Sequence, residues 1–257
     1  MSHLEEIKSE IQRYYQRSVE RTQEYEKELD LLDKAFGNGE KIFVRDRTPT
    51  FFSGNLEAPI VHIGLNPGHS GKKRSEWAEP DSDSFEDYWD FYTTFFQNCI
   101  DNEKKMSHYS SIAHFIQGLN DDEYSKDITK SPNYLKYFSQ NVLNLDMIPY
   151  HSSNIHSIDK EAGVEEYLTG YRELIEKIIN LHDRTFIVIT GEDTYDFLFP
   201  NDKPELKEMN PSRRKKVNYG KTELFGEDAV IVKQHLPSRG LKEPAKYLLG
   251  QTLRHMD

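Results

Sequence analysis

The sequence has one cysteine, no long apolar run and a shortage of basic residues. Cys99 is the only cysteine, which excludes an intramolecular disulfide and a multi-cysteine metal cluster. No apolar run approaches the length of a membrane span, and the N-terminus lacks the basic start and apolar core of a secretory signal. These absences predict a cytoplasmic protein without a membrane partner.

Positive charge is scarce, because 33 Lys and Arg residues stand against 44 Asp and Glu residues, for a formal net charge of −11. Overall charge therefore argues against generic binding to nucleic acid, although a local patch can differ in sign from the whole. Basic clusters occur at residues 72–74 and 213–216, and an acidic stretch covers residues 76–90. Taken alone, each basic cluster is typical of a solvated loop.

Apolar periodicity predicts strands that alternate with helices. Buried strands are expected at residues 58–63, 142–148, 186–190 and 229–234. Helices are expected at residues 3–36, 84–102, 107–119, 132–140, 164–181, 192–198 and 244–255, and a further strand at 216–224 with a turn at 226–228. This order favours an α/β fold, a three-layer sandwich whose central four-stranded, mainly parallel sheet has helices on both faces.

The first helical segment is charged and ends at Gly37-Asn38-Gly39. We therefore expect an N-terminal helical extension over residues 1–40 and a single α/β domain over residues 41–257. The sequence contains no internal repeat and no convincing linker. A monomer is the simplest expectation.

Three predicted strands end in polar loops, at residues 64–69, 149–154 and 235–240. In a parallel sheet these ends lie on the same side, so the loops should converge on one crevice. The polar residues that the loops and their strands offer are Asn66, His69, Asn144, Tyr150, His151, Ser152, His235, Ser238 and Arg239.

Two of these loops carry a family resemblance. Gly64-Leu65-Asn66-Pro67-Gly68 resembles the first motif of the uracil-DNA glycosylase superfamily, in its mismatch-specific and single-strand-selective branches. His235-Leu236-Pro237-Ser238 is similar to the second motif of that family, a His-Pro-Ser or Asn-Pro-Ser loop after the last strand. The order and spacing of segments are similar over residues 55–250.

The resemblance implies a monofunctional DNA glycosylase that hydrolyses the N-glycosidic bond of a flipped-out uracil-like or modified base, with no metal or other cofactor. Its partner would be single- or double-stranded DNA, including modified DNA. Asn66 would hold the attacking water through its side-chain carbonyl, and His235 would stabilise the departing base. These two residues are the catalytic candidates.

The resemblance also implies a substrate-binding set. Asn144 would read the base edge with its amide, Trp77 or Phe85 would stack on the base, and Ser238 and Arg239 would contact phosphate or the gap left by the flipped nucleotide. The full set is Gly64, Leu65, Pro67, Gly68, Trp77, Asn144, Tyr150, His151, Ser238 and Arg239.

The second motif departs from the family pattern, because Leu236 stands between His235 and Pro237. If Pro237-Ser238 sets the register, Leu236 takes the catalytic place. The alternative is a protein with the glycosylase fold that binds nucleic acid or a nucleotide without cutting it. The acidic charge and the irregular motif both favour that alternative.

Simpler interpretations accompany these residues. Asn66 before proline is typical of a turn, and His235 of a strand end with one backbone hydrogen bond. His62 alternates with core residues, which favours a satisfied interior histidine. Residues 68–73 superficially suggest a nucleotide-triphosphate loop, but Asn66 and Lys73 occupy positions where that pattern needs Gly and Ser or Thr. A looser phosphate site remains open there.

Overall fold

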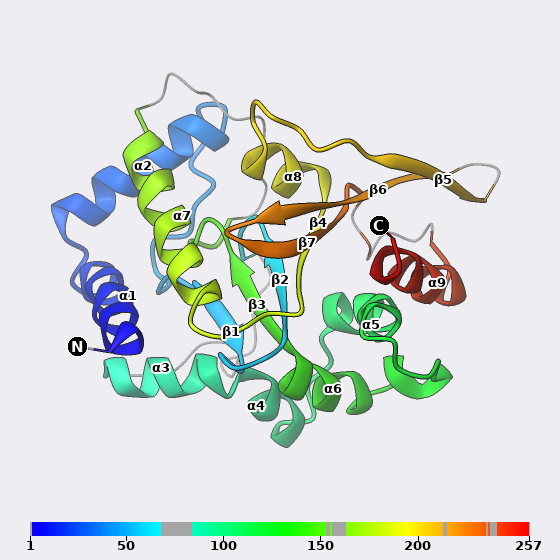
Figure 1. The fold of residues 1–257 in the computed structure, drawn as a ribbon. Helices are drawn as coiled ribbons and strands as arrows, with labels where there is room; N and C mark the ends of the chain where they lie inside the picture. The colour runs from blue at the N-terminus through cyan, green and yellow to red at the C-terminus, as the bar shows by residue number, and fades with distance from the viewer. Residues whose placement is uncertain are drawn as a thin grey trace. The chain divides into compact units, whose positions relative to one another are not determined.

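The computed structural model describes residues 2–67, 84–152, 155, 163–212, 215–234, 236 and 241–256, with only the backbone of residues 211, 212 and 215. Within these residues the chain is an α/β protein with one mixed sheet (Figure 1). It forms two compact units, the first from residues 1–52, 65–93 and 145–181, the second from residues 53–64, 94–144 and 182–257. The predicted boundary near residue 40 stays a prediction. None of the described helices is long and apolar enough to cross a membrane.

The sheet has seven strands among the described residues, in the order β1-β3-β2-β4-β7-β6-β5. The strands are β1 (Phe52–Gly54), β2 (Ile60–Gly64), β3 (Val142–Asp146), β4 (Phe186–Thr190), β5 (Lys207–Ser212), β6 (Lys215–Leu224) and β7 (Glu227–Val232). The four predicted core strands correspond to the adjacent strands β3, β2, β4 and β7. The expected four-stranded sheet is therefore extended by β1 on one side and by β6 and β5 on the other.

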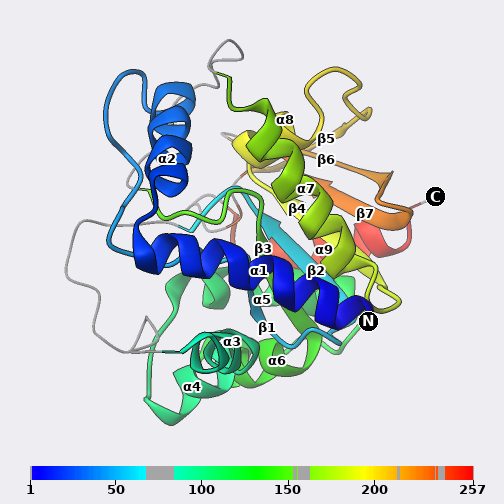
Figure 2. The same ribbon diagram turned by 90° about the vertical axis from the view of Figure 1, so that its left-hand side faces the viewer.

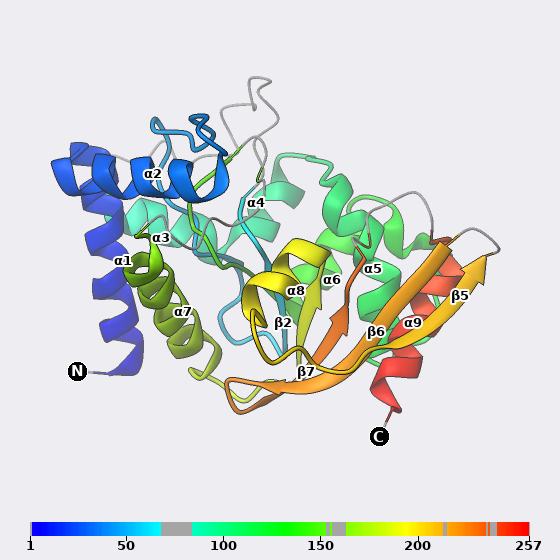
Figure 3. The same ribbon diagram turned by 90° about the horizontal axis from the view of Figure 1, so that it is seen from above.

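Strands β2, β4 and β7 run parallel, with Ile60 opposite Phe186 and Ile187 opposite Ala229. Each is an almost continuous apolar run, which is typical of a parallel strand covered on both faces. Strand β6 pairs antiparallel with both β7 and β5, and Figure 3 shows β5 and β6 running side by side. Phe225 and Gly226 both have positive φ, 56° and 83°, so the β6–β7 turn lies one residue earlier than predicted.

The helices of the second unit are α4 (Phe95–Asp101), α5 (Ser107–Leu119), the 3-10 helix η2 (Lys126–Thr129), α6 (Asn133–Asn141), α8 (Glu192–Leu198) and α9 (Glu243–Arg254). Helices α5 and α9 pack closely through glycine. A Cβ at Gly118 would lie 2.1 Å from the carbonyl oxygen of Tyr247, and one at Gly250 would lie 2.3 Å from that of Phe115. The predicted bounds of α5 and α8 are confirmed.

The helices of the first unit are α1 (His3–Glu20), α2 (Gln23–Phe36), α3 (Phe85–Thr93) and α7 (Glu165–Ile179). The single helix predicted over residues 3–36 is wrong, because Arg21 is left-handed, with φ 49°, and the Thr22 hydroxyl accepts from Tyr25 N at 3.2 Å to cap α2. Figure 2 shows α1 and α2 as separate helices joined at a bend. The predicted helix 84–102 is likewise divided, at Thr94, into α3 and α4.

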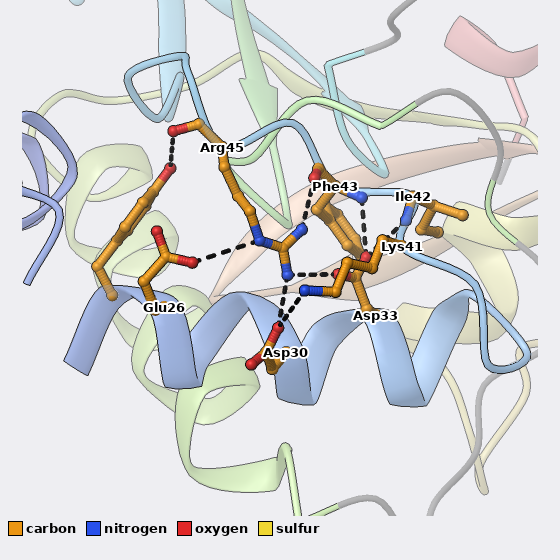
Figure 4. A network of polar contacts seen from close by, with 8 residues as sticks. Glu26, Asp30, Asp33, Lys41, Ile42, Phe43 and Arg45 are labelled. Carbon is orange, nitrogen blue, oxygen red and sulfur yellow. Dashed lines mark hydrogen bonds and ion pairs between the residues drawn. The ribbon is translucent and has the colours of Figure 1, made fainter. Parts of the chain in front are cut away.

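Helix α2 fixes the segment that follows it. The Asp33 carboxylate accepts from the backbone nitrogens of Ile42 at 2.7 Å and Phe43 at 2.9 Å, and from Arg45 Nη2 at 2.6 Å (Figure 4). Arg45 Nη2 also binds the more exposed Asp30 at 2.7 Å. Phe43 in turn forms an antiparallel bridge with Ser152, so this segment reaches the loop after β3.

Candidate functional site

Asn66 lies two residues after the end of β2, and hydrogen bonds from its side-chain nitrogen hold the carboxamide in place. Nδ2 donates to Ser152 Oγ at 2.8 Å and to the carbonyl oxygen of Pro67 at 3.1 Å, and it lies 3.4 Å from that of Tyr150. The opposite atom, Oδ1, accepts no hydrogen bond from the described residues. A carboxamide fixed in this way presents a free acceptor in a set direction, which is suited to holding a water molecule.

The Asn66 turn is joined to the loop after β3 by backbone hydrogen bonds as well. Ile148 N donates to the carbonyl oxygen of Leu65 at 2.8 Å, and Ser152 N donates to that of Pro67 at 3.2 Å. The structure therefore brings four of the predicted site residues together in the first unit: Leu65, Asn66, Pro67 and Tyr150.

The loop after β3 is also bonded to the segment of residues 44–50. Thr50 N donates to the carbonyl oxygen of Pro149 at 2.6 Å, and Val44 N donates to that of His151 at 2.9 Å. The His151 ring is buried, with Nε2 3.2 Å from Thr50 Oγ1. His151, predicted to contact substrate, thus packs its side chain inside the first unit.

The Tyr150 side chain is also buried, and its hydroxyl donates to Glu28 Oε1 at 3.2 Å. Tyr150 therefore contributes its backbone carbonyl, and not its ring, to the surroundings of Asn66. Burial raises the pKa of the Tyr150 phenol well above its ordinary value, and the Glu28 carboxylate raises it further. The phenol therefore remains a neutral donor.

Glu28 is the centre of a buried polar cluster that was not predicted from the sequence. Its carboxylate is fully buried on α2 and accepts from Arg17, Tyr171 and Tyr150. Burial raises the pKa of Glu28, and the hydrogen bond from Tyr171 and the Arg17 charge oppose that rise. One signal was present: Glu28 lies three residues after Tyr25 and four before Leu32, in the middle of the apolar stripe of α2.

A second polar cluster crosses the sheet within the second unit. His62 on β2 is buried, with Nδ1 2.8 Å from Asn144 Oδ1 on β3 and Nε2 2.9 Å from Thr190 Oγ1 on β4. The carboxamide oxygen only accepts, so Nδ1 carries a proton and donates to it, while Nε2 pairs with the Thr190 hydroxyl. The interpretation of His62 as a satisfied interior histidine is confirmed.

This arrangement orients Asn144, which lies at the middle of β3 as expected. Its oxygen is committed to His62, so its Nδ2 points the other way as a fixed donor. Such a donor suits the recognition of a carbonyl oxygen on a ligand.

The remaining predicted site residues divide into two groups. Gly64 closes β2 and is partly exposed. His235, Gly68, Trp77, Ser238 and Arg239 lie outside the described residues. Leu236, the residue that interrupts the second motif, is described and is 2% exposed. Among the described side chains, no group of three or more His, Cys, Asp or Glu residues is placed to hold a metal ion.

No family model matches the chain, and no curated protein matches it.

Proposed function

We propose that the protein is a monofunctional DNA glycosylase with the three-layer fold of the uracil-DNA glycosylase superfamily. It hydrolyses the N-glycosidic bond of a flipped-out uracil-like or modified base. One observation carries the proposal: the Asn66 carboxamide, in a Gly-x-Asn-Pro-Gly turn after a core strand, is fixed through its nitrogen by Ser152 and two carbonyl oxygens. This is the arrangement that water positioning requires.

The reaction separates a positively charged sugar from a negatively charged base. Water adds to C1′ of the sugar while the base departs with the bonding electron pair, and the proton released by the water goes to solvent or to the base. Asn66 Oδ1 accepts a hydrogen bond from this water and directs its lone pair at C1′. Since a carboxamide does not take up a proton at neutral pH, Asn66 positions the water and is not a general base. Its fixed geometry spares reorganisation during the reaction.

Asn144 acts on the base side in this proposal. His62 holds its oxygen at 2.8 Å, so its amide Nδ2 is available as an oriented donor. Bases with a carbonyl group at the recognised edge, such as uracil, offer the matching acceptor. His235 supplies a second donor to the departing base, by the resemblance of its loop to the second family motif.

A second candidate function is favoured by Leu236. This residue occupies the catalytic place if Pro237-Ser238 sets the register, and its buried side chain offers no hydrogen-bond donor. The protein would then bind a nucleic acid or nucleotide in the same fold without cleaving it.

The test uses single- and double-stranded oligonucleotides that carry a panel of modified bases, followed by alkali to reveal abasic sites. We expect cleavage by the parent protein and a loss of about a hundredfold or more in Asn66→Ala, as for removal of one catalytic hydrogen-bonding group. Asn102→Ala, at the exposed end of α4, is the matched control and should retain the parent rate.

Three outcomes separate the candidates. Equal cleavage by the parent and Asn66→Ala would show that Asn66 has no catalytic role. Binding without cleavage of any base would favour the second candidate. Turnover of ATP or GTP would favour a phosphate site at residues 68–73.

A further inference from the structure

The Glu28 carboxylate joins four segments of the first unit at one point. It projects from α2 and is fully buried. Arg17 reaches it from α1 and Tyr171 from α7, while Tyr150 reaches it from the loop after β3 at 3.2 Å. A buried carboxylate needs such donors, so each of these side chains is restricted to one orientation.

Tyr150 connects this cluster to the candidate catalytic turn. Its hydroxyl is bound to Glu28, while its carbonyl oxygen lies 3.4 Å from Asn66 Nδ2. Ser152, two residues further on, provides the shortest bond to Asn66, at 2.8 Å. The Asn66 carboxamide is therefore oriented by a loop that Glu28 binds through Tyr150.

We propose that Glu28 is a positioning residue, which acts through Tyr150 to hold the loop of residues 148–152 against the turn of residues 65–67. Its catalytic consequence rests on the proposed glycosylase function, whereas its effect on the loop does not. Glu28 touches no substrate. It acts on Asn66 through Tyr150, whose hydroxyl binds Glu28 and whose carbonyl oxygen lies near Asn66 Nδ2.

Tyr171 provides a control for substitution of Tyr150. Tyr150 and Tyr171 both donate to Glu28 and both are buried, so replacing either with phenylalanine removes one hydroxyl from the same carboxylate. Tyr171 belongs to α7, whereas Tyr150 belongs to the loop that binds Asn66. A merely structural role for the cluster predicts equal effects of the two substitutions. The positioning role predicts that Tyr150→Phe alone affects the loop.

The deciding experiment is hydrogen–deuterium exchange of the full-length chain with peptide or NMR resolution. The reporters are the amides of Ile148 and Ser152, which donate to Leu65 and Pro67. We expect Tyr150→Phe to accelerate their exchange by about tenfold, the effect of one lost hydrogen bond, and Tyr171→Phe to leave it within about twofold of the parent. Unchanged exchange in Tyr150→Phe, or equal acceleration in both variants, would overturn the proposal.

Cleavage assays add a second readout. If the parent cleaves DNA, Tyr150→Phe should lower the single-turnover rate about tenfold and leave DNA affinity unchanged, while Tyr171→Phe retains both. A parent-like rate in Tyr150→Phe would overturn the positioning role. If the parent cleaves no base, the glycosylase proposal fails, and the exchange result alone supports or overturns the role of Glu28.

Discussion

The side-chain nitrogen of Asn66 lies 2.8 Å from the hydroxyl oxygen of Ser152, although the two residues are 86 positions apart in the chain. One follows β2 and the other follows β3. The bond holds the donor end of the carboxamide, and the acceptor end accepts no hydrogen bond from the described residues. An asparagine that only shaped its own turn would need no partner from a distant loop.

Ser152→Ala tests the importance of this bond. We expect the cleavage rate to fall about threefold to tenfold, because one net hydrogen bond contributes about 1 kcal/mol and tenfold corresponds to about 1.4 kcal/mol. Single-turnover cleavage of the best substrate from the base panel is the measurement. Ser139→Ala is the control, since the Ser139 hydroxyl donates within α6, to the carbonyl oxygen of Lys136 at 2.8 Å. Equal rates in parent and Ser152→Ala would show that the backbone acceptors suffice to orient Asn66.

Thr190→Val tests the polar cluster across the sheet. The substitution preserves shape but removes the hydroxyl that lies 2.9 Å from the buried His62 Nε2, and with it one buried hydrogen bond. We expect the free energy of unfolding to fall by about 1–3 kcal/mol in urea titrations. Thr222→Val on the half-buried part of β6 is the control for the Thr-to-Val change in a strand, and its effect should be smaller. A loss no larger than in the control would show that His62 does not depend on Thr190.

Sequence periodicity predicted the centre of the fold well, because the parallel strands are apolar on both faces. β4, α5 and α8 have the predicted bounds, and β2, β3 and β7 lie within two residues of their predicted starts. For the parallel strands, the apolar runs alone were sufficient to predict the position of each strand. Strand β5, with the sequence Lys-Glu-Met-Asn-Pro-Ser, was missed because an exposed outer strand has no such run.

Two other features depended on tertiary contacts that periodicity does not contain. The bend at Arg21 interrupts a continuous helical pattern, and only the left-handed conformation of that residue and the Thr22 cap reveal it. The place of Glu28 in the apolar stripe of α2 indicates burial, but its partners Arg17 and Tyr171 come from other helices and are not contained in the periodicity. The Asn66 motif was recognisable in the sequence, whereas its partner Ser152 was one of several polar residues in a loop.

Cys99 offers a test of core integrity by thiol labelling. The thiol is fully buried, and burial raises its pKa to about 12. Because a raised pKa favours the neutral thiol, only about one molecule in ten thousand carries the reactive thiolate at pH 8. We expect the native protein to resist alkylation at that pH and to be labelled stoichiometrically in denaturing urea, as followed by mass spectrometry. Rapid labelling of the native chain would mean that the packing around α4 opens readily.

The last prediction compares two acidic residues of α2 that bind the same arginine. Asp33 accepts from Ile42 N, Phe43 N and Arg45, whereas the more exposed Asp30 forms an ion pair with Arg45 at 2.7 Å and has no backbone donor among the described residues (Figure 4). Asp33→Ala leaves two buried amides unpaired, so we expect a loss of about 2–4 kcal/mol in the free energy of unfolding. Asp30→Ala should cost less than about 1 kcal/mol, as is usual for an exposed ion pair.

Urea unfolding of both variants measures the difference, and exchange at the Ser152 amide shows how far it extends. Phe43 forms a bridge with Ser152, so loss of the Asp33 cap should also accelerate exchange at Ser152, while Asp30→Ala should leave it unchanged. Equal destabilisation by the two substitutions would assign the stability to the Arg45 ion pairs instead of the capped amides.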